Sequence, residues 1–141
     1  MTRPDTDIAY PHQLSVTRKF IAQHRLIVPN PEPPEGEVHS HRFTVAVRFF
    51  GQTLNEYGYL VDITAVEAII DRLEQRYRDA LLNNLPEFEG KNPSVERFAR
   101  VFADKVDEDL TAETPDVIEV RIWEDETAWG SYQKELTTDE R

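Results

Sequence analysis

The sequence of 141 residues contains no cysteine. Its absence excludes disulfides and thiolate metal sites, and it excludes any reaction that needs a sulfur nucleophile. Basic residues are also few, since 16 Lys and Arg stand against 27 Asp and Glu and leave a formal net charge of -11. Because duplex nucleic acid and anionic membranes are bound by clusters of basic side chains, this balance argues against both partners.

Long apolar runs are missing as well. No segment is apolar for long enough to cross a bilayer, and the first residues, MTRPDTDIAYPHQ, lack the basic region and apolar core of a secretion signal. We therefore expect a cytoplasmic protein without a membrane partner. The length suits a single domain with one core.

Alternating apolar and polar residues predict strands near both ends of the chain. Residues 16–26, VTRKFIAQHRL, and residues 39–51, HSHRFTVAVRFFG, follow this period of two. The segment between them, VPNPEPPEGE, is too rich in proline to continue a ladder and is predicted to be a loop. VIEVRIWED and, more weakly, SYQKEL predict two further strands near the end of the chain.

Apolar residues at helical spacing predict two helices in the middle of the chain. The first covers about residues 63–81, with Thr64 and Glu67 as a capping box, and has the inner face Ile63, Val66, Ile70, Leu73, Tyr77, Ala80 and Leu81. Ser94 caps the second, whose inner face is Phe98, Val101, Phe102, Lys105 or Val106, and Leu110. The order β-β-α-α-β-β predicts an α+β fold, with an antiparallel sheet covered by helices on one face. Its two open edges could be closed by an oligomer.

Three of the four histidines fall on the apolar faces of predicted strands. His39 and His41 lie on one side of a strand, about 7 Å apart at Cα, and pairing of the first two strands can bring His24 beside them. Three neutral imidazoles with an open fourth position form a catalytic zinc site. The alternative is that each histidine is exposed at a strand end or hydrogen-bonded in the core. His12 is expected to be only solvated.

Polar residues at the ends of other elements are candidate ligand contacts. Glu124 continues an apolar stripe. Its carboxylate could accept two hydrogen bonds from a ligand with two adjacent N–H donors, such as a guanine-like or pterin ring edge, or it could simply emerge into water. Ser94 and Glu96 lie at a helix start, where they could touch a ligand or serve only the helix. Arg78 and Asp79 read by default as surface charges.

Taken in order, six short motifs resemble the 6-pyruvoyl-tetrahydropterin and 6-carboxy-tetrahydropterin synthase family. They are FIAQH (residues 20–24), HSH (residues 39–41), GYLVD (residues 58–62), Leu82 with Asn83, PSVE (residues 93–96), and Glu124 with Asp125. The resemblance spans residues 14–135, which we expect to form the domain between a flexible lead-in, residues 1–13, and a tail, residues 136–141. Each motif is weak alone, and their order and spacing carry the resemblance.

The resemblance implies a function and an assembly. It makes His24, His39 and His41 zinc ligands and Glu124 the anchor of a pterin, and it makes Ser94 a contact to the pterin of a neighbouring subunit. It also implies the tunnelling fold (T-fold), in which a trimer closes a barrel of twelve strands and two trimers form a homo-hexamer. The expected activity is that of a lyase acting on the side chain of a 7,8-dihydropterin.

Two departures from the family pattern bear on catalysis. Glu35 stands at the position of the family cysteine that acts as base, and the stretch that holds an Asp-His pair in the family offers only Arg78 and Asp79 here. In having glutamate at the cysteine position, the chain resembles a subgroup of the family. Members of that subgroup cleave the side chain of dihydroneopterin by a retro-aldol reaction and give 6-hydroxymethyl-dihydropterin. The expected catalytic residues are therefore Glu35 and Asp79. The alternative is a pterin-binding homologue without catalytic activity.

Overall fold

The computed structural model describes residues 8–136, which form four strands and two long helices. Residues 1–7 of the predicted lead-in and 137–141 of the predicted tail lie outside the described residues. The strands are β1 (His12–His24), β2 (His39–Gly51), β3 (Val117–Trp123) and β4 (Trp129–Glu135). They form one antiparallel sheet in the order β1-β2-β3-β4, as the alternation predicts.

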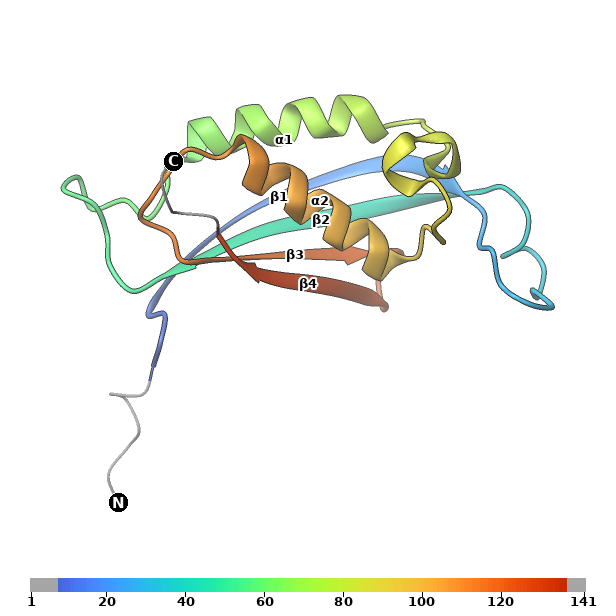
Figure 1. Ribbon diagram of the computed structural model, residues 1–141, viewed down its shortest axis with the longest axis horizontal. Helices are drawn as coiled ribbons and strands as arrows, with labels where there is room; N and C mark the ends of the chain where they lie inside the picture. Colours follow the sequence, from blue (N-terminus) through green and yellow to red (C-terminus); the bar gives the residue numbers. More distant parts are fainter. Residues whose placement is uncertain (1–7, 137–141) are drawn as a thin grey trace, which may run out of the picture.

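Both helices lie on one face of this sheet (Figure 1). They are α1 (Ile63–Tyr77) and α2 (Val95–Asp109), and two short 3-10 turns, η2 (Leu82–Asn84) and η3 (Pro86–Phe88), lie between them. The α+β fold with a singly covered antiparallel sheet is therefore confirmed. No helix in the described part of the chain is long and apolar enough to span a membrane, and the cytoplasmic location stays a prediction.

The first strand is shifted relative to its predicted range of residues 16–26. It begins at His12, which pairs with Gly51, so His12 belongs to the sheet and not to a solvated lead-in. It ends at His24 because the backbone of Arg25 turns to the side chain of Asn83, which accepts from its N–H at 2.9 Å and donates to its carbonyl at 3.1 Å.

The helix boundaries correct one predicted cap and confirm another. Asp62, not Thr64, caps α1, since its carboxylate accepts a hydrogen bond from the Thr64 N–H at 2.9 Å. The helix ends at Tyr77 because Asp79 adopts a positive φ of 61°, which a right-handed helix cannot contain. Ser94 caps α2 as predicted, with its hydroxyl accepting from the Arg97 N–H at 3.1 Å.

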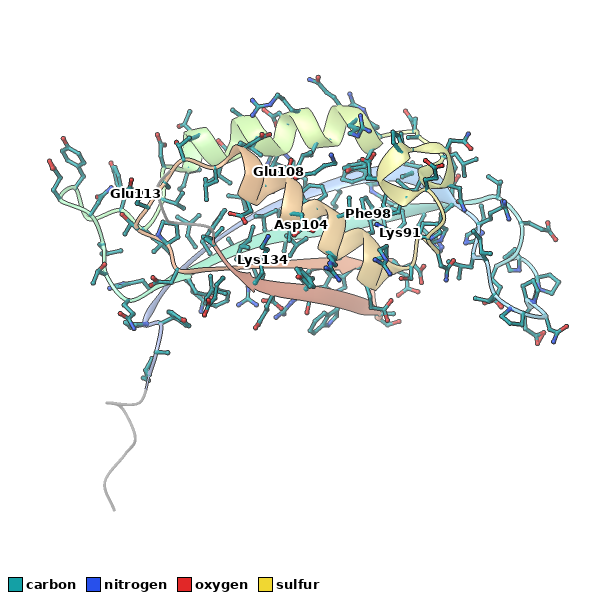
Figure 2. All side chains as sticks on the ribbon, in the orientation of Figure 1. Lys91, Phe98, Asp104, Glu108, Glu113 and Lys134 are labelled. Atoms are coloured by element: carbon teal, nitrogen blue, oxygen red, sulfur yellow. The ribbon has the colours of Figure 1, made fainter. Side chains whose placement is uncertain are left out.

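Aromatic side chains fill the space between α2 and the sheet. Phe98 lies at the centre of this core, which also contains Phe20, Phe43, Tyr77, Phe88 and Phe102 at ring-centroid distances of 5.1 to 6.3 Å from it. Lys134 on β4 ties the sheet to α2 through Asp104, at 3.0 Å (Figure 2). This packing fixes the ends of β1 and β2 against the start of α2, where the histidines lie.

Candidate metal and ligand site

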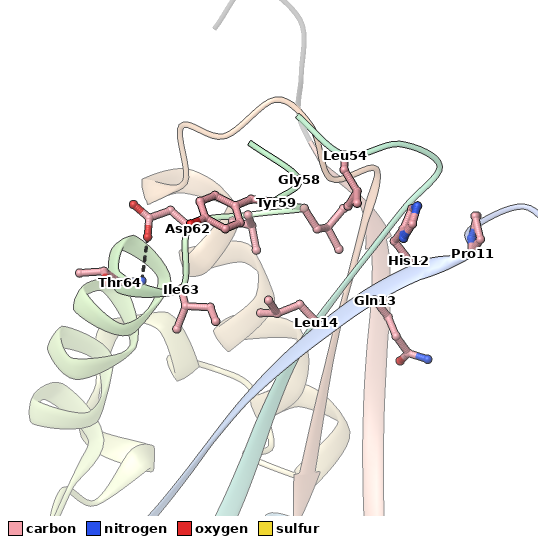
Figure 3. A pocket seen from close by; sticks show the side chains of 12 residues that line it. Pro11, His12, Gln13, Leu14, Leu54, Gly58, Tyr59, Asp62, Ile63 and Thr64 are labelled. Carbon is pink, nitrogen blue, oxygen red and sulfur yellow. Dashed lines mark hydrogen bonds between the residues drawn. The ribbon is translucent and has the colours of Figure 1, made fainter. Parts of the chain in front are cut away.

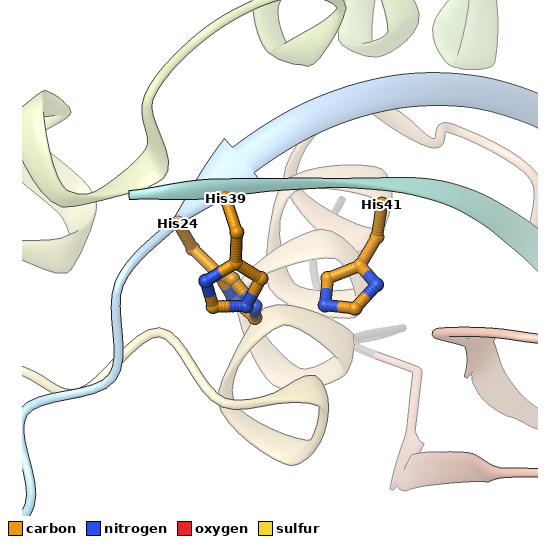
Figure 4. Close-up of side chains that lie close together, drawn as sticks. All are labelled: His24, His39 and His41. Atoms are coloured by element: carbon orange, nitrogen blue, oxygen red, sulfur yellow. The ribbon is translucent and has the colours of Figure 1, made fainter. Parts of the chain in front are cut away.

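The register of β1 and β2 brings the three predicted histidines together. His24 pairs directly with His39, and His41 lies two residues further along β2, opposite Ala22. Since residues two apart share a face of a strand, all three rings project to the same side of the sheet (Figure 4). The ring centroids of His24, His39 and His41 are 4.7 to 5.1 Å apart.

Each ring can contribute a nitrogen to a common point, since the three candidate ligand atoms lie within 4.8 Å of one another. His24 Nδ1 lies 2.9 Å from the carbonyl oxygen of Pro93, and His39 Nδ1 lies 2.7 Å from that of Glu37. A carbonyl only accepts, so both Nδ1 atoms donate and both Nε2 atoms keep a lone pair. Backbone partners of this kind commonly orient metal-binding histidines.

Burial favours the neutral form of two of these rings. His24 is completely buried, and its burial lowers its pKa below the usual value despite the bond to Pro93. Burial likewise lowers the pKa of His41, against the opposing effect of Glu124. Neutral imidazoles have the lone pairs that a metal ion requires.

One buried nitrogen atom shows that the three histidines fit a metal ion. His24 Nε2 is buried and has no hydrogen-bond partner in the described structure. Buried polar atoms are nearly always satisfied, and an unsatisfied one costs about 1 to 3 kcal/mol. A cation held by the three histidines would satisfy it, and a set of three imidazoles suits zinc.

Glu124 follows the last residue of β3 and completes the cluster. Its Oε1 lies 3.5 Å from His41 Nε2 and 3.7 Å from His24 Nε2, and its side chain is 29% exposed. The carboxylate thus faces the rings and does not emerge fully into water. Beside it lies a cavity of about 780 Å³, lined by Thr17, Lys19, Ser40, His41, Arg42, Thr44, Trp123, Glu124, Asp125 and Glu126.

The start of α2 is near the histidines through its backbone. Pro93, which binds His24, directly precedes the cap residue Ser94. The Ser94 hydroxyl is occupied by the helix N-terminus, while Glu96 is exposed and its side chain lies beside Gly130 at the start of β4. Neither residue is joined to the histidines by a hydrogen bond in the described structure, so their ligand contacts stay predictions.

The two predicted catalytic residues lie in the loops that flank the site. Glu35 is half-buried, and its Oε1 accepts a hydrogen bond from the Glu32 N–H at 2.9 Å. Its carbonyl accepts from Leu26, which closes the loop between β1 and β2 at 2.7 Å. Asp79 is exposed after α1, and its N–H donates to Ile21 of β1 at 2.6 Å. Their catalytic roles stay predictions.

Two asparagines hydrogen-bond to the chain just after β1, and the sequence did not predict that they support the site. The Asn83 side chain bonds to both the N–H and the carbonyl of Arg25. The Asn92 side chain accepts from the Ile27 N–H at 2.7 Å. These residues flank His24 in space and fix the chain that carries it. The Leu82 and Asn83 motif marked one of them, but no sequence pattern shows that its amide replaces a strand partner.

A second cavity of about 620 Å³ lies at the start of β1 (Figure 3). Its lining includes His12, Tyr59 and Asp62. The Asp62 carboxylate is already engaged as the cap of α1, as the dashed line in Figure 3 shows. The clustered histidines therefore distinguish the opposite end of the strand as the candidate site.

Comparison with known proteins agrees with this geometry. The family model of 6-pyruvoyl tetrahydropterin synthase matches residues 13–135. The chain belongs to this family. Membership places it among the enzymes of pterin metabolism and their homologues. Among curated proteins, the comparison finds no match.

Solved structures of 6-pyruvoyl tetrahydropterin synthases share the fold at low identity. The enzyme of Caenorhabditis elegans has a TM-score of 0.72 and 16% identity, over 90% of this chain and 99% of that one. The enzyme of Plasmodium vivax has a TM-score of 0.74 and 13% identity, over 88% and 98%. Two further structures of that enzyme are of catalytic residue mutants, in which a glutamate is replaced by cysteine or by alanine. The predicted T-fold of the subunit is thereby confirmed.

Proposed function

We propose that the protein is a zinc-dependent lyase acting on the side chain of a 7,8-dihydropterin. The single observation that carries the proposal is the convergence of three histidine nitrogens within 4.8 Å, in a chain of the 6-pyruvoyl tetrahydropterin synthase family. His24, His39 and His41 would hold the zinc ion. When bound, the ion would stabilise negative charge that develops on the side-chain oxygens of the substrate.

The other residues bind the substrate and move its protons. The Glu124 carboxylate accepts two hydrogen bonds from the adjacent N–H groups of the pterin ring, and Ser94 and Glu96 contact the pterin at the subunit boundary. Glu35 removes a proton from the side chain, and Asp79 assists proton transfer. Catalysis by a glutamate has a parallel in the Plasmodium vivax enzyme, whose catalytic residue mutants replace a glutamate.

A carboxylate base favours cleavage of a carbon–carbon bond in dihydroneopterin to give 6-hydroxymethyl-dihydropterin. In that retro-aldol reaction a side-chain hydroxyl proton leaves to the base, and the carbon that bears this hydroxyl becomes the carbonyl of the released glycolaldehyde. The electron pair of the broken carbon–carbon bond passes to the pterin side, where a proton is added back to give 6-hydroxymethyl-dihydropterin. An ordinary glutamate has a pKa of about 4.3, against about 8.5 for cysteine. A carboxylate is therefore the weaker base of the two.

A pterin-binding homologue without activity is the second candidate function. It is favoured by the bond that Glu35 Oε1 accepts from the Glu32 N–H, which ties the proposed base to its own loop. The exposure of Asp79, without a neighbouring histidine in sequence, points the same way. Under this alternative, Glu124 and the fold are retained for binding alone.

Incubation with dihydroneopterin and with its triphosphate, followed by product identification, tests the proposal. We expect 6-hydroxymethyl-dihydropterin or a pyruvoyl-type product from one of them. Glu35→Gln should abolish turnover and leave pterin affinity intact, whereas Glu124→Ala should weaken pterin binding by about 1 to 3 kcal/mol. Pterin binding without product from either compound would establish the binding-only alternative.

We also propose a homo-hexamer built from two barrel-forming trimers. In the described sheet, β1 and β4 each have one strand partner. The outer edge of β4, and that of β1 before Ile21 and Gln23, which bond to Asp79 and Ala80, can therefore pair with other subunits. The native mass from light scattering tests this, and a monomer at micromolar concentration would refute it.

A further inference from the structure

The Glu124 carboxylate approaches two histidines at distances that a direct hydrogen bond does not explain. Its Oε1 is 3.5 Å from His41 Nε2 and 3.7 Å from His24 Nε2, at or beyond the limit of a normal hydrogen bond. His24 Nε2 has no hydrogen-bond partner in the described structure although it is buried. The carboxylate therefore lies against a nitrogen that it does not satisfy.

The tautomer of His24 makes this contact unfavourable without a positive charge. Its Nδ1 donates to the Pro93 carbonyl, so Nε2 of the neutral ring presents a lone pair to Glu124. Two atoms with lone pairs repel at this distance, and burial strengthens the repulsion. A cation between them converts the repulsion into two bonds.

The 3.5 Å between Glu124 Oε1 and His41 Nε2 matches the spacing of ligands that share one zinc ion, and the 3.7 Å to His24 Nε2 is only slightly longer. With bonds of roughly 2.0 to 2.2 Å in a tetrahedral site, neighbouring ligand atoms lie about 3.3 to 3.6 Å apart, and a carboxylate oxygen is an ordinary zinc ligand. We infer that Glu124 Oε1 is a fourth metal ligand, which closes the site of His24, His39 and His41 while no substrate is bound.

The inference rests on the proposed function and adds an order of events to it. Glu124 cannot bind the metal and accept two hydrogen bonds from a pterin edge with the same carboxylate at the same time. The incoming ring must therefore draw the carboxylate away and leave the fourth position open. The Glu124 backbone is held in the turn after β3 by its N–H bond to the Ala128 carbonyl, at 3.1 Å, so the side chain is the part that must rotate.

The experiment measures metal binding without any turnover. Zinc affinity is determined by competition with a chromophoric chelator for the wild type, Glu124→Ala, Glu124→Gln and the control Glu113→Gln, an exposed glutamate that lines neither described cavity. Loss of the carboxylate should weaken zinc binding at least tenfold, because mutation of even the residues that hydrogen-bond to metal ligands commonly costs that much. The control should bind like the wild type.

A second measurement reports whether the fourth position is open. Azide is titrated into the cobalt-substituted proteins while the visible spectrum is recorded. The wild-type spectrum should resist azide at concentrations that shift the spectrum of Glu124→Ala. Saturating pterin, which has the ring edge but no hydroxylated side chain to occupy the metal, should make the wild type respond. Equal zinc affinities together with equal azide responses would overturn the inference.

The outcomes separate this inference from the proposed function. If zinc affinity depends on Glu124 but the protein has no lyase activity, Glu124 is supported as the fourth ligand and the proposed lyase function is refuted. If the protein turns over a dihydropterin while its zinc affinity and azide response do not depend on Glu124, the lyase function is supported and the fourth ligand is refuted. Failure of the wild type to bind zinc or cobalt at all would overturn the inference without deciding whether a pterin binds.

Discussion

Two clusters of ionisable side chains differ in how completely the protein satisfies them. In the first, the Glu87 carboxylate accepts hydrogen bonds from Arg76 at 2.6 and 2.7 Å and from the Tyr77 hydroxyl at 2.7 Å. In the second, His24 Nε2 is buried without a partner beside the Glu124 carboxylate. Both clusters join residues that are distant in the sequence, yet one is closed and the other is left open.

The comparison separates a structural network from a binding site. The hydrogen bonds from Arg76 hold the pKa of Glu87 down at about 2, so the network is stable as a charged group within the protein. The histidine cluster instead has two rings, His24 and His41, whose pKa is lowered by burial, which favours the neutral form with a free lone pair. Ionisable groups that a fold leaves unsatisfied indicate a ligand.

Breaking the open cluster should have the largest effect. Removal of one imidazole in His39→Ala should lower zinc occupancy after dialysis well below one ion per chain, since it leaves two histidines and the Glu124 carboxylate in place of a four-ligand site. The half-exposed His39 contributes little to the core, so the fold should persist. Metal analysis after dialysis and circular dichroism check both statements, with His12→Ala as control. Full metal retention in His39→Ala would refute the site.

Breaking the closed cluster should affect stability and not metal binding. The pKa of Glu87 is about 2 when folded and 4.5 ordinarily, which corresponds to about 3 kcal/mol of stabilisation by the charged form. Because the folded pKa is depressed, this contribution is complete above about pH 4.5 and is lost as the pH falls toward 2.

Glu87→Gln isolates that contribution. Its free energy of unfolding should be lower than that of the wild type by up to about 3 kcal/mol at pH 7, and the difference should shrink below pH 4.5. Denaturant titrations at several pH values check this, with the exposed Glu89→Gln as the matched control. A difference that is constant with pH would contradict the charged network.

The sequence predicted the open cluster better than the closed one, for a physical reason. The histidines lie on strands whose period of two and antiparallel register fix which side chains meet, so His24, His39 and His41 could be assigned to one face. The partners of Glu87 lie on α1, ten and eleven residues away, and meet it only because two 3-10 turns fold back. Such loop geometry has no periodic signal.

The same limit explains the predicted boundaries that were wrong. The alternation of residues 16–26 continued to Leu26, but the strand ends at His24 because the amide of Asn83 replaces the next strand partner. Thr64 has the side chain of a cap, yet Asp62 takes that role because it directly precedes α1. Local patterns locate the elements, and contacts that are distant in sequence decide where they stop.

A smaller effect should come from loosening the support of the open cluster. Asn83→Ala removes both hydrogen bonds to the Arg25 backbone, at a cost of about 1 to 2 kcal/mol. Because Arg25 follows His24 directly, zinc affinity should fall by roughly tenfold, as for other outer-shell changes. Asn84→Ala, in the same 3-10 turn but exposed, is the matched control. Equal zinc affinities in the two variants would show that Asn83 does not support the site.

The smallest effect is expected for Arg78→Ala, whose loss of stability is compared with that of Arg76→Ala. Arg76 lies in the closed cluster, whereas Arg78 is 52% exposed and pairs with Glu74 at 3.2 Å on the surface of α1. Solvent screens such a pair, so Arg78→Ala should change the free energy of unfolding by less than about 0.5 kcal/mol. Arg76→Ala should cost several times more, because it leaves the Glu87 carboxylate short of two donors. Equal losses in parallel urea titrations would mean that the closed network contributes no more than an ordinary surface ion pair.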